Sequence, residues 1–125
     1  MKLEYLPDGS PDCPLLRLFA FTKAEAKQLR AAVSALAAGR PAVAVHRLPF
    51  VEAVGGCQLT LQVTGWDQAI TRGAGCNEFT CGFTAGTWAN VAGLLEPFAE
   101  STAGSQWLAG PPGEAALVLS ASGQW

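Results

Sequence analysis

The chain has 125 residues, half of them hydrophobic, and a formal net charge of −2. This length suits one domain, residues 1–125, and the hydrophobic content excludes a disordered chain. The eight lysines and arginines are scattered, which argues against a nucleic-acid-binding surface, and no apolar run approaches the ~20 residues that span a bilayer.

The first part of the chain predicts two strands. Residues 2–6, KLEYL, have the pattern of a short strand, and a loop rich in proline follows them. Residues 15–21, LLRLFAF, are apolar on both faces apart from Arg17. Such a run is typical of a central strand that is covered on both sides.

A helix should follow at once. Thr22, with Glu25 three residues later, forms a capping box, in which each side chain bonds a backbone N–H at the other position. We therefore expect a helix over residues 23–38, which Gly39 then ends. Its apolar residues recur at helical spacing and should face the core: Ala26, Leu29, Val33 and Leu36.

Residues 42–48, AVAVHRL, predict a strand that holds His46 on its solvent side. Residues 50–64, FVEAVGGCQLTLQVT, then predict a β-hairpin whose turn is Gly55-Gly56, because glycine adopts positive φ without strain. In that register Glu52 falls on the apolar face, unless it lies near the sheet edge. The second strand of the hairpin should turn an uncharged face outward: Gln58, Thr60, Gln62 and Thr64.

The second half predicts a similar series of elements. A short strand around residues 69–71 and a strand over 77–83 precede a helix over 85–99, which Thr84 caps. Pro97 should distort or end the last turn of this helix. A final hairpin is expected from strands at 105–109 and 114–120, joined by the turn 110–113. The apolar stripe of the helix is Trp88, Val91, Ala92, Leu95 and Phe98.

The two halves resemble each other at an offset of 62, where residues 19–22 match 81–84 and the apolar helix positions align. A duplication and a shared local pattern both explain this pseudo-repeat of strand-helix-strand-strand units. The predicted order is β-β-α-β-β-β-β-α-β-β. It favours an α+β fold, a mainly antiparallel sheet with both helices packed on one face.

Candidate chemistry is sparse, and we assign no catalytic residue, metal site or cofactor. Cys76 and Cys81 would face opposite sides of one strand, which does not suit zinc. The glycine-rich segments precede no helix and so are not phosphate loops. Glu52 could form a buried ion pair with Arg17 or Arg47, or bind a ligand.

Only 14% of the residues are charged, against about 25% in an average protein, so part of the surface must be uncharged. We expect a homo-oligomer, most simply a dimer, in the cytoplasm, since the first residues lack a signal-peptide pattern. We expect no nucleic-acid or membrane partner. The uncharged hairpin face, continued by Glu78, Thr80 and Gly82 and by Leu16, Leu18 and Ala20, is the expected contact surface.

Three functions remain open. The first is a non-enzymatic interaction or regulatory domain that self-associates, or binds another protein, through the uncharged sheet face. The second is a small-molecule-binding domain with a pocket between sheet and helices, lined by Trp88, Phe98 and Phe79 with Glu52 as its polar group. The third is an enzyme that uses Cys57 or His46. The candidate binding residues are Glu52, Gln58, Thr60, Gln62, Thr64, Arg17 and His46.

Overall fold

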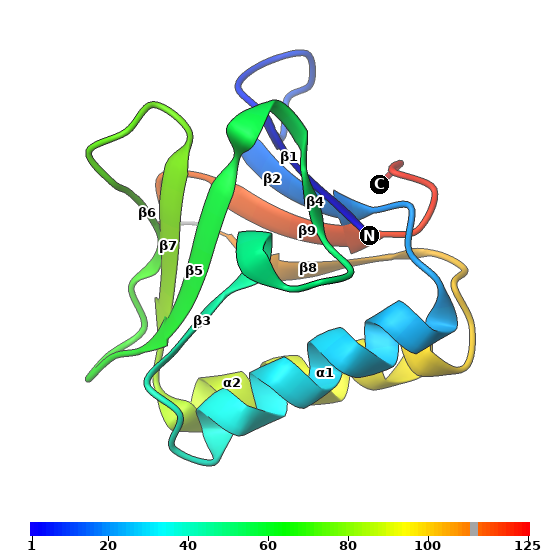
Figure 1. Ribbon diagram of the computed structural model, residues 1–125. Helices are drawn as coiled ribbons and strands as arrows, with labels where there is room; N and C mark the ends of the chain where they lie inside the picture. The colour runs from blue at the N-terminus through cyan, green and yellow to red at the C-terminus, as the bar shows by residue number, and fades with distance from the viewer. Residues whose placement is uncertain (111–112) are drawn as a thin grey trace.

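The computed structural model describes residues 1–110 and 113–125, and within them the chain is α+β, with two α-helices and nine strands (Figure 1). The predicted turn 110–113 lies partly outside the described residues. The helices are α1 (Lys23–Ala37) and α2 (Ala85–Leu95), and short 3-10 turns lie at η1 (Val45–Arg47), η2 (Val54–Gly56) and η3 (Glu96–Ala99). The strands are β1 (Lys2–Leu6), β2 (Leu15–Phe19), β3 (Ala42–Ala44), β4 (Glu52–Ala53), β5 (Gln58–Val63), β6 (Ala69–Arg72), β7 (Glu78–Phe83), β8 (Ser105–Ala109) and β9 (Ala116–Ser120).

Over the described residues the strands form two mixed sheets, not one mainly antiparallel sheet as the sequence predicts. Sheet A has the order β4-β1-β2-β9-β8, and sheet B has the order β3-β5-β7-β6. The pairs β1·β4, β2·β9 and β5·β7 are parallel. In Figure 1, α1 and α2 lie against each other below both sheets, so the core is enclosed by three layers.

The two halves of the chain interlock. The first half consists of the hairpin β1-β2, then α1, then β3, β4 and β5, and the second consists of β6-β7, α2, β8 and β9. Strand β2 pairs with β9, and β7 pairs with β5, so each sheet contains strands from both halves. Thr22 and Thr84 are both N-caps, again 62 residues apart. The strand pairing therefore agrees with the pseudo-repeat that the sequence suggests.

Each helix begins on a threonine cap supported by a carboxylate. In α1 the predicted capping box is present: Glu25 accepts the Thr22 backbone N–H at 2.9 Å. In α2, Asp67 has the role that Glu25 has in α1: its carboxylate accepts the Thr84 backbone N–H at 2.9 Å. Pro97 falls in η3, which ends the second helix four residues earlier than predicted.

The predicted hairpin over residues 50–64 is wrong. Gly55 and Gly56 do adopt positive φ, 64° and 72°, but they lie in turn η2, which leads the chain from sheet A to sheet B. Strand β4 pairs in parallel with β1, while β5 pairs with β3 and β7. Between β3 and β7, the backbone hydrogen-bonding groups on both edges of β5 find partners. A hairpin with the segment that contains Glu52 would supply partners on one edge only.

The interior is closely packed. The predicted inward residues of both helices are buried, from fully buried Ala26 and Leu95 to Phe98 at 6% exposure, except Ala92, which is partly buried. Trp88 packs edge-on against Phe83 and donates its indole N–H to the Gln62 carbonyl at 2.9 Å. This hydrogen bond attaches α2, from the second half, to β5, from the first.

Candidate functional site

The outward side of sheet B carries the uncharged surface that the sequence predicts. Leu59 and Leu61 of β5, and Phe79 and Cys81 of β7, are at most 4% exposed and face the core. Side chains alternate along a strand, so the residues between them face away. We call this surface the threonine face; it comprises Ala42, Ala44, Gln58, Thr60, Gln62, Thr64, Thr71, Glu78 and Thr80.

Small uncharged residues run in a row across the middle of this face. Thr60 lies between Ala44 of β3 and Thr80 of β7, and Thr80 lies in turn beside Thr71 of β6. All of these side chains are partly exposed. Glu78, at one end of β7, is the charged member of the face. The middle of the face is therefore uncharged, and its exposed polar groups are hydroxyls and amides.

A tryptophan that the sequence analysis did not single out stands at the other end of the threonine face. The link from β5 to β6 passes the end of β7, and the side chains of Thr64 and Gln68 lie over Gly82. A Cβ on Gly82 would come within 2.9 Å of the Thr64 methyl group. Trp66, in the middle of the link, is 66% exposed. A large aromatic residue within a Gly-Trp-Asp turn was the signal that could have identified it.

The expected extension of this surface onto residues 15–21 is wrong. Leu16 and Leu18 are at most 2% exposed and face the core from sheet A. Ala20 is exposed, but it follows β2 in a left-handed conformation with φ of 53°. The error follows from assuming one sheet, because a second sheet places these strands in a different layer.

Glu52 is not buried and does not pair with Arg17 or Arg47. It lies in the edge strand β4 with its side chain 69% exposed, and its carboxylate is 4.0 Å from the Lys2 ammonium. An exposed pair at this distance contributes little to stability. The interpretation that Glu52 sits at a sheet edge is thus the correct one.

The Arg17 side chain lies on the outer side of sheet A and is held there by several contacts. Its Nε donates to the Glu4 carboxylate at 2.8 Å, and Nη1 donates to the Gly123 carbonyl at 3.0 Å. The guanidinium also stacks on the Phe19 ring, 4.0 Å from its centroid. Glu4 stands directly opposite Arg17 in the antiparallel pairing of β1 with β2, which is why it is the ion partner.

His46 has a structural role, because its imidazole bonds the backbone of β5. The predicted strand 42–48 ends at Ala44, and His46 lies in η1. Its Nδ1 accepts the backbone N–H of Leu59 at 3.1 Å. The imidazole thereby satisfies a backbone donor of β5 just beyond the point where β3 stops, and it is half-buried against the strand.

The two buried cysteines, Cys57 and Cys81, do not suit the role of a nucleophile. All four are free thiols, and burial raises the pKa of Cys57 to about 11 and that of Cys81 to about 12. Both thiols therefore stay protonated at neutral pH, whereas a nucleophilic cysteine needs a lowered pKa. Among the described residues no group of three or more histidine, cysteine, aspartate or glutamate side chains could hold a metal ion.

The pocket expected between sheet and helices is filled. The free space bordered there by Trp88, Leu61 and Leu117 amounts to about 10 Å³, which is the size of a single water at most. Phe79 and Phe98 are buried in the same core, and Glu52 lies outside it. A small molecule has no room in the position that the second function requires.

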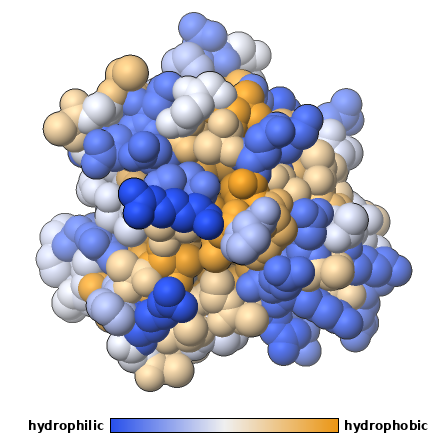
Figure 2. Space-filling model, viewed as in Figure 1, coloured by the Kyte–Doolittle hydropathy of each residue, from blue (hydrophilic) through white to orange (hydrophobic). Residues whose placement is uncertain are grey.

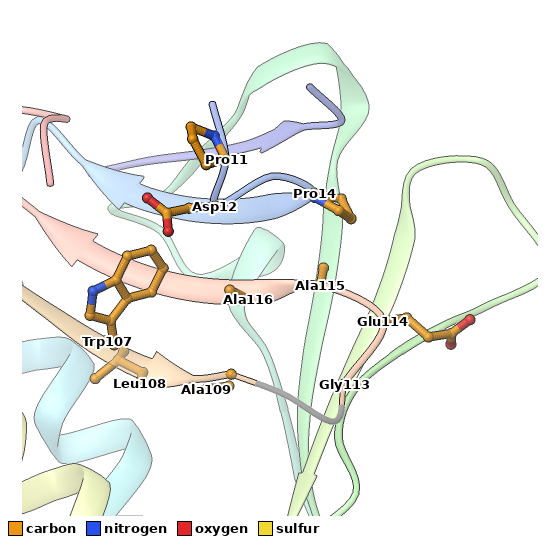
Figure 3. A pocket seen from close by; sticks show the side chains of 11 residues that line it. Pro11, Asp12, Pro14, Trp107, Leu108, Ala109, Gly113, Glu114, Ala115 and Ala116 are labelled. Atoms are coloured by element: carbon orange, nitrogen blue, oxygen red, sulfur yellow. The ribbon is translucent and has the colours of Figure 1, made fainter. Parts of the chain in front are cut away.

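An open groove of about 620 Å³ lies instead on the outer side of sheet A (Figure 3). It runs between the β1–β2 loop and the β8-β9 strands. Asp12 and Trp107 line one end of the groove, and at the other end Glu114 points away from it. The remaining lining residues are Pro11, Pro14, Leu108, Ala109, Gly110, Gly113, Ala115 and Ala116.

Figure 2 shows how hydrophilic and hydrophobic residues are distributed over one side of the molecule. In Figure 2 hydrophilic atoms are dense over the first half of α1, and hydrophobic atoms gather near the centre of the same view.

Within the described residues no helix is both long and apolar enough to cross a membrane. Comparisons of this chain with family models, curated proteins and solved structures find no match.

Proposed function

We propose that the protein is a non-enzymatic interaction domain that self-associates as a homodimer through the threonine face. The observation that carries this proposal is the pairing of a flat, nearly uncharged sheet surface with the exposed Trp66 at its end. Tryptophan is enriched among the residues that dominate binding energy.

A second copy is the occupant that the charge pattern fits best. A two-fold contact opposes the same patch on both subunits, so a charged patch would repel its own copy. The threonine face avoids this repulsion. Its charged residue, Glu78, lies at one end of the face, so a two-fold axis through the middle would keep the two copies of Glu78 apart. Three of the eight basic residues lie on α1, on the helical side of the molecule: Lys23, Lys27 and Arg30.

The size of the face indicates a reversible dimer. Four strands about 4.8 Å apart, each with up to six residues of about 3.3 Å, give a surface of roughly 400 Å². A standard interface buries about 800 Å² per partner. The exposed part of Trp66 adds on the order of 160 Å². The total remains below the standard size, which favours dissociation in the micromolar range.

Charge substitution at the centre of the face tests this proposal. Thr80→Lys places a lysine opposite the partner's surface, and Thr80→Glu places a carboxylate there. Each variant alone should be monomeric, with the dissociation constant raised by about 100-fold or more by like-charge repulsion. A mixture of the two variants should restore the dimer, because the opposite charges then face each other.

Sedimentation velocity of the two variants, singly and mixed, provides the measurement. Ser34→Lys is the matched control, since Ser34 is exposed on α1 and the substitution adds the same charge away from the face. It should dimerise as the unmodified chain does. A Thr80→Lys variant that dimerises normally, or a control that dissociates equally, would contradict the proposal.

A further inference from the structure

The groove on sheet A contains an acidic and aromatic end that the proposed dimer does not use. Trp107 projects from β8 on the outer side of the sheet and is 40% exposed. Asp12, in the β1–β2 loop, reaches over it from the opposite wall, and Ala116 lies in the floor between Trp107 and Pro14 (Figure 3). The volume of about 620 Å³ is within the usual range for small-ligand sites.

The charged residues of the groove have one sign, and Asp12 is the one at the Trp107 end. Among the described residues that line the groove, Asp12 and Glu114 carry charge, and both are carboxylates. Glu114 accepts the Arg72 backbone N–H at 2.7 Å and points away. Asp12 accepts the Trp125 indole N–H on Oδ2 at 2.9 Å, which leaves Oδ1 available to a ligand.

The cation nearest to this surface in the sheet does not neutralise it. Arg17 shares the outer side of sheet A, but it does not line the groove, and its charge is paired with Glu4 at 2.8 Å. The Asp12 carboxylate therefore faces an aromatic ring with no basic side chain among the described lining residues. A carboxylate beside an exposed indole is the arrangement that attracts a positive group, by charge and by the ring quadrupole.

We infer that this end of the groove, formed by Asp12, Trp107 and Ala116, binds a small organic cation of the substituted-ammonium class. The ammonium group lies between the indole and the Asp12 carboxylate, and the apolar substituents contact Ala116 and Pro14. The site is on sheet A, whereas the threonine face is on sheet B. Binding of the cation and formation of the dimer can therefore be tested separately.

The four tryptophan indole N–H groups report on the site in a ¹H–¹⁵N correlation spectrum. Choline is the probe, and dimethylbutanol, in which carbon replaces the charged nitrogen, is its neutral isostere. Choline should shift the Trp107 and Trp125 signals in a saturable manner, and the isostere should not. The buried Trp88 indole, bonded to the Gln62 carbonyl, reports that the fold is intact.

Two variants test the residues. Asp12→Asn keeps an oxygen that can accept the Trp125 N–H but removes the charge, and it should weaken choline binding by up to about fivefold. Trp107→Ala should abolish the choline-dependent shift of Trp125. Leu94→Ala, a change at an exposed side chain on α2, should leave binding unchanged. Equal saturation by the isostere, no saturable shift with choline, or unaltered affinity in Asp12→Asn would overturn the inference.

Discussion

Replacing Trp88 by phenylalanine tests whether the interior is as closely packed as the structure shows. The indole is 1% exposed, and its N–H donates to the Gln62 carbonyl at 2.9 Å. Phenylalanine lacks this donor, and loss of one such hydrogen bond costs about 1 kcal/mol. The smaller ring also leaves a cavity of about 40 Å³, which costs about 1 kcal/mol more. We therefore expect Trp88→Phe to lower the free energy of unfolding by about 2 kcal/mol.

Urea denaturation followed by circular dichroism measures this loss, with Trp66→Phe as the matched control. Trp66 is 66% exposed, so its replacement should change the free energy of unfolding by less than about 0.5 kcal/mol. The proposed dimer would be linked to stability by mass action, so both variants are compared at one low protein concentration. If Trp88→Phe lowers the free energy of unfolding no more than the control does, the core is not closely packed around Trp88. An internal ligand pocket would then be a candidate again.

Two further predictions follow from the pKa shifts. The Met1 ammonium and then the helix cap lower the pKa of Glu25, and the Thr84 N–H lowers that of Asp67, so both carboxylates stabilise the fold above about pH 4 and lose this effect as the pH falls further. Urea midpoints should thus fall between pH 6 and pH 3, and less steeply in Asp67→Asn; equal slopes would contradict this. Thiol labelling of the native protein should modify exposed Cys76 and spare Cys57 and Cys81, and rapid modification of either buried thiol would disagree with their raised pKa.

Local signals in the sequence predicted the helices well. The capping box at Thr22 and the spacing of Leu29 and Leu36 depend on residues within a few positions of one another, and both helices begin where the sequence indicates. The alternation in β5 was equally clear, because Leu59 and Leu61 could not be turned toward water without loss of their burial. The pattern of strands, helices and buried faces was therefore predictable.

Strand partners were not predictable from the same signals. The Gly55-Gly56 turn has the backbone conformation that a hairpin needs, yet it connects strands in different sheets. What decides the pairing is the burial of β5 beside β7, which follows it in the sequence by some fifteen residues. No local pattern contains that information.

The candidate sites likewise contain residues that the sequence predicted and residues that it did not. Thr60 and Gln62 were identified from alternation alone, but Trp66 lies in a turn whose position over the sheet depends on the crossover past β7. Asp12 and Trp107 are 95 positions apart and line one groove only because the β1–β2 loop lies over the same side of sheet A as β8. A groove of this kind has no signature in the sequence.

The mass of the unmodified protein in solution tests the central claim most directly. Sedimentation velocity over concentrations from about 5 µM to about 500 µM covers the affinity expected for an interface of this size. We predict a reversible shift from the monomer mass of 13.0 kDa toward twice that mass as the concentration rises. A single species at 13.0 kDa over the whole range would contradict self-association through the threonine face.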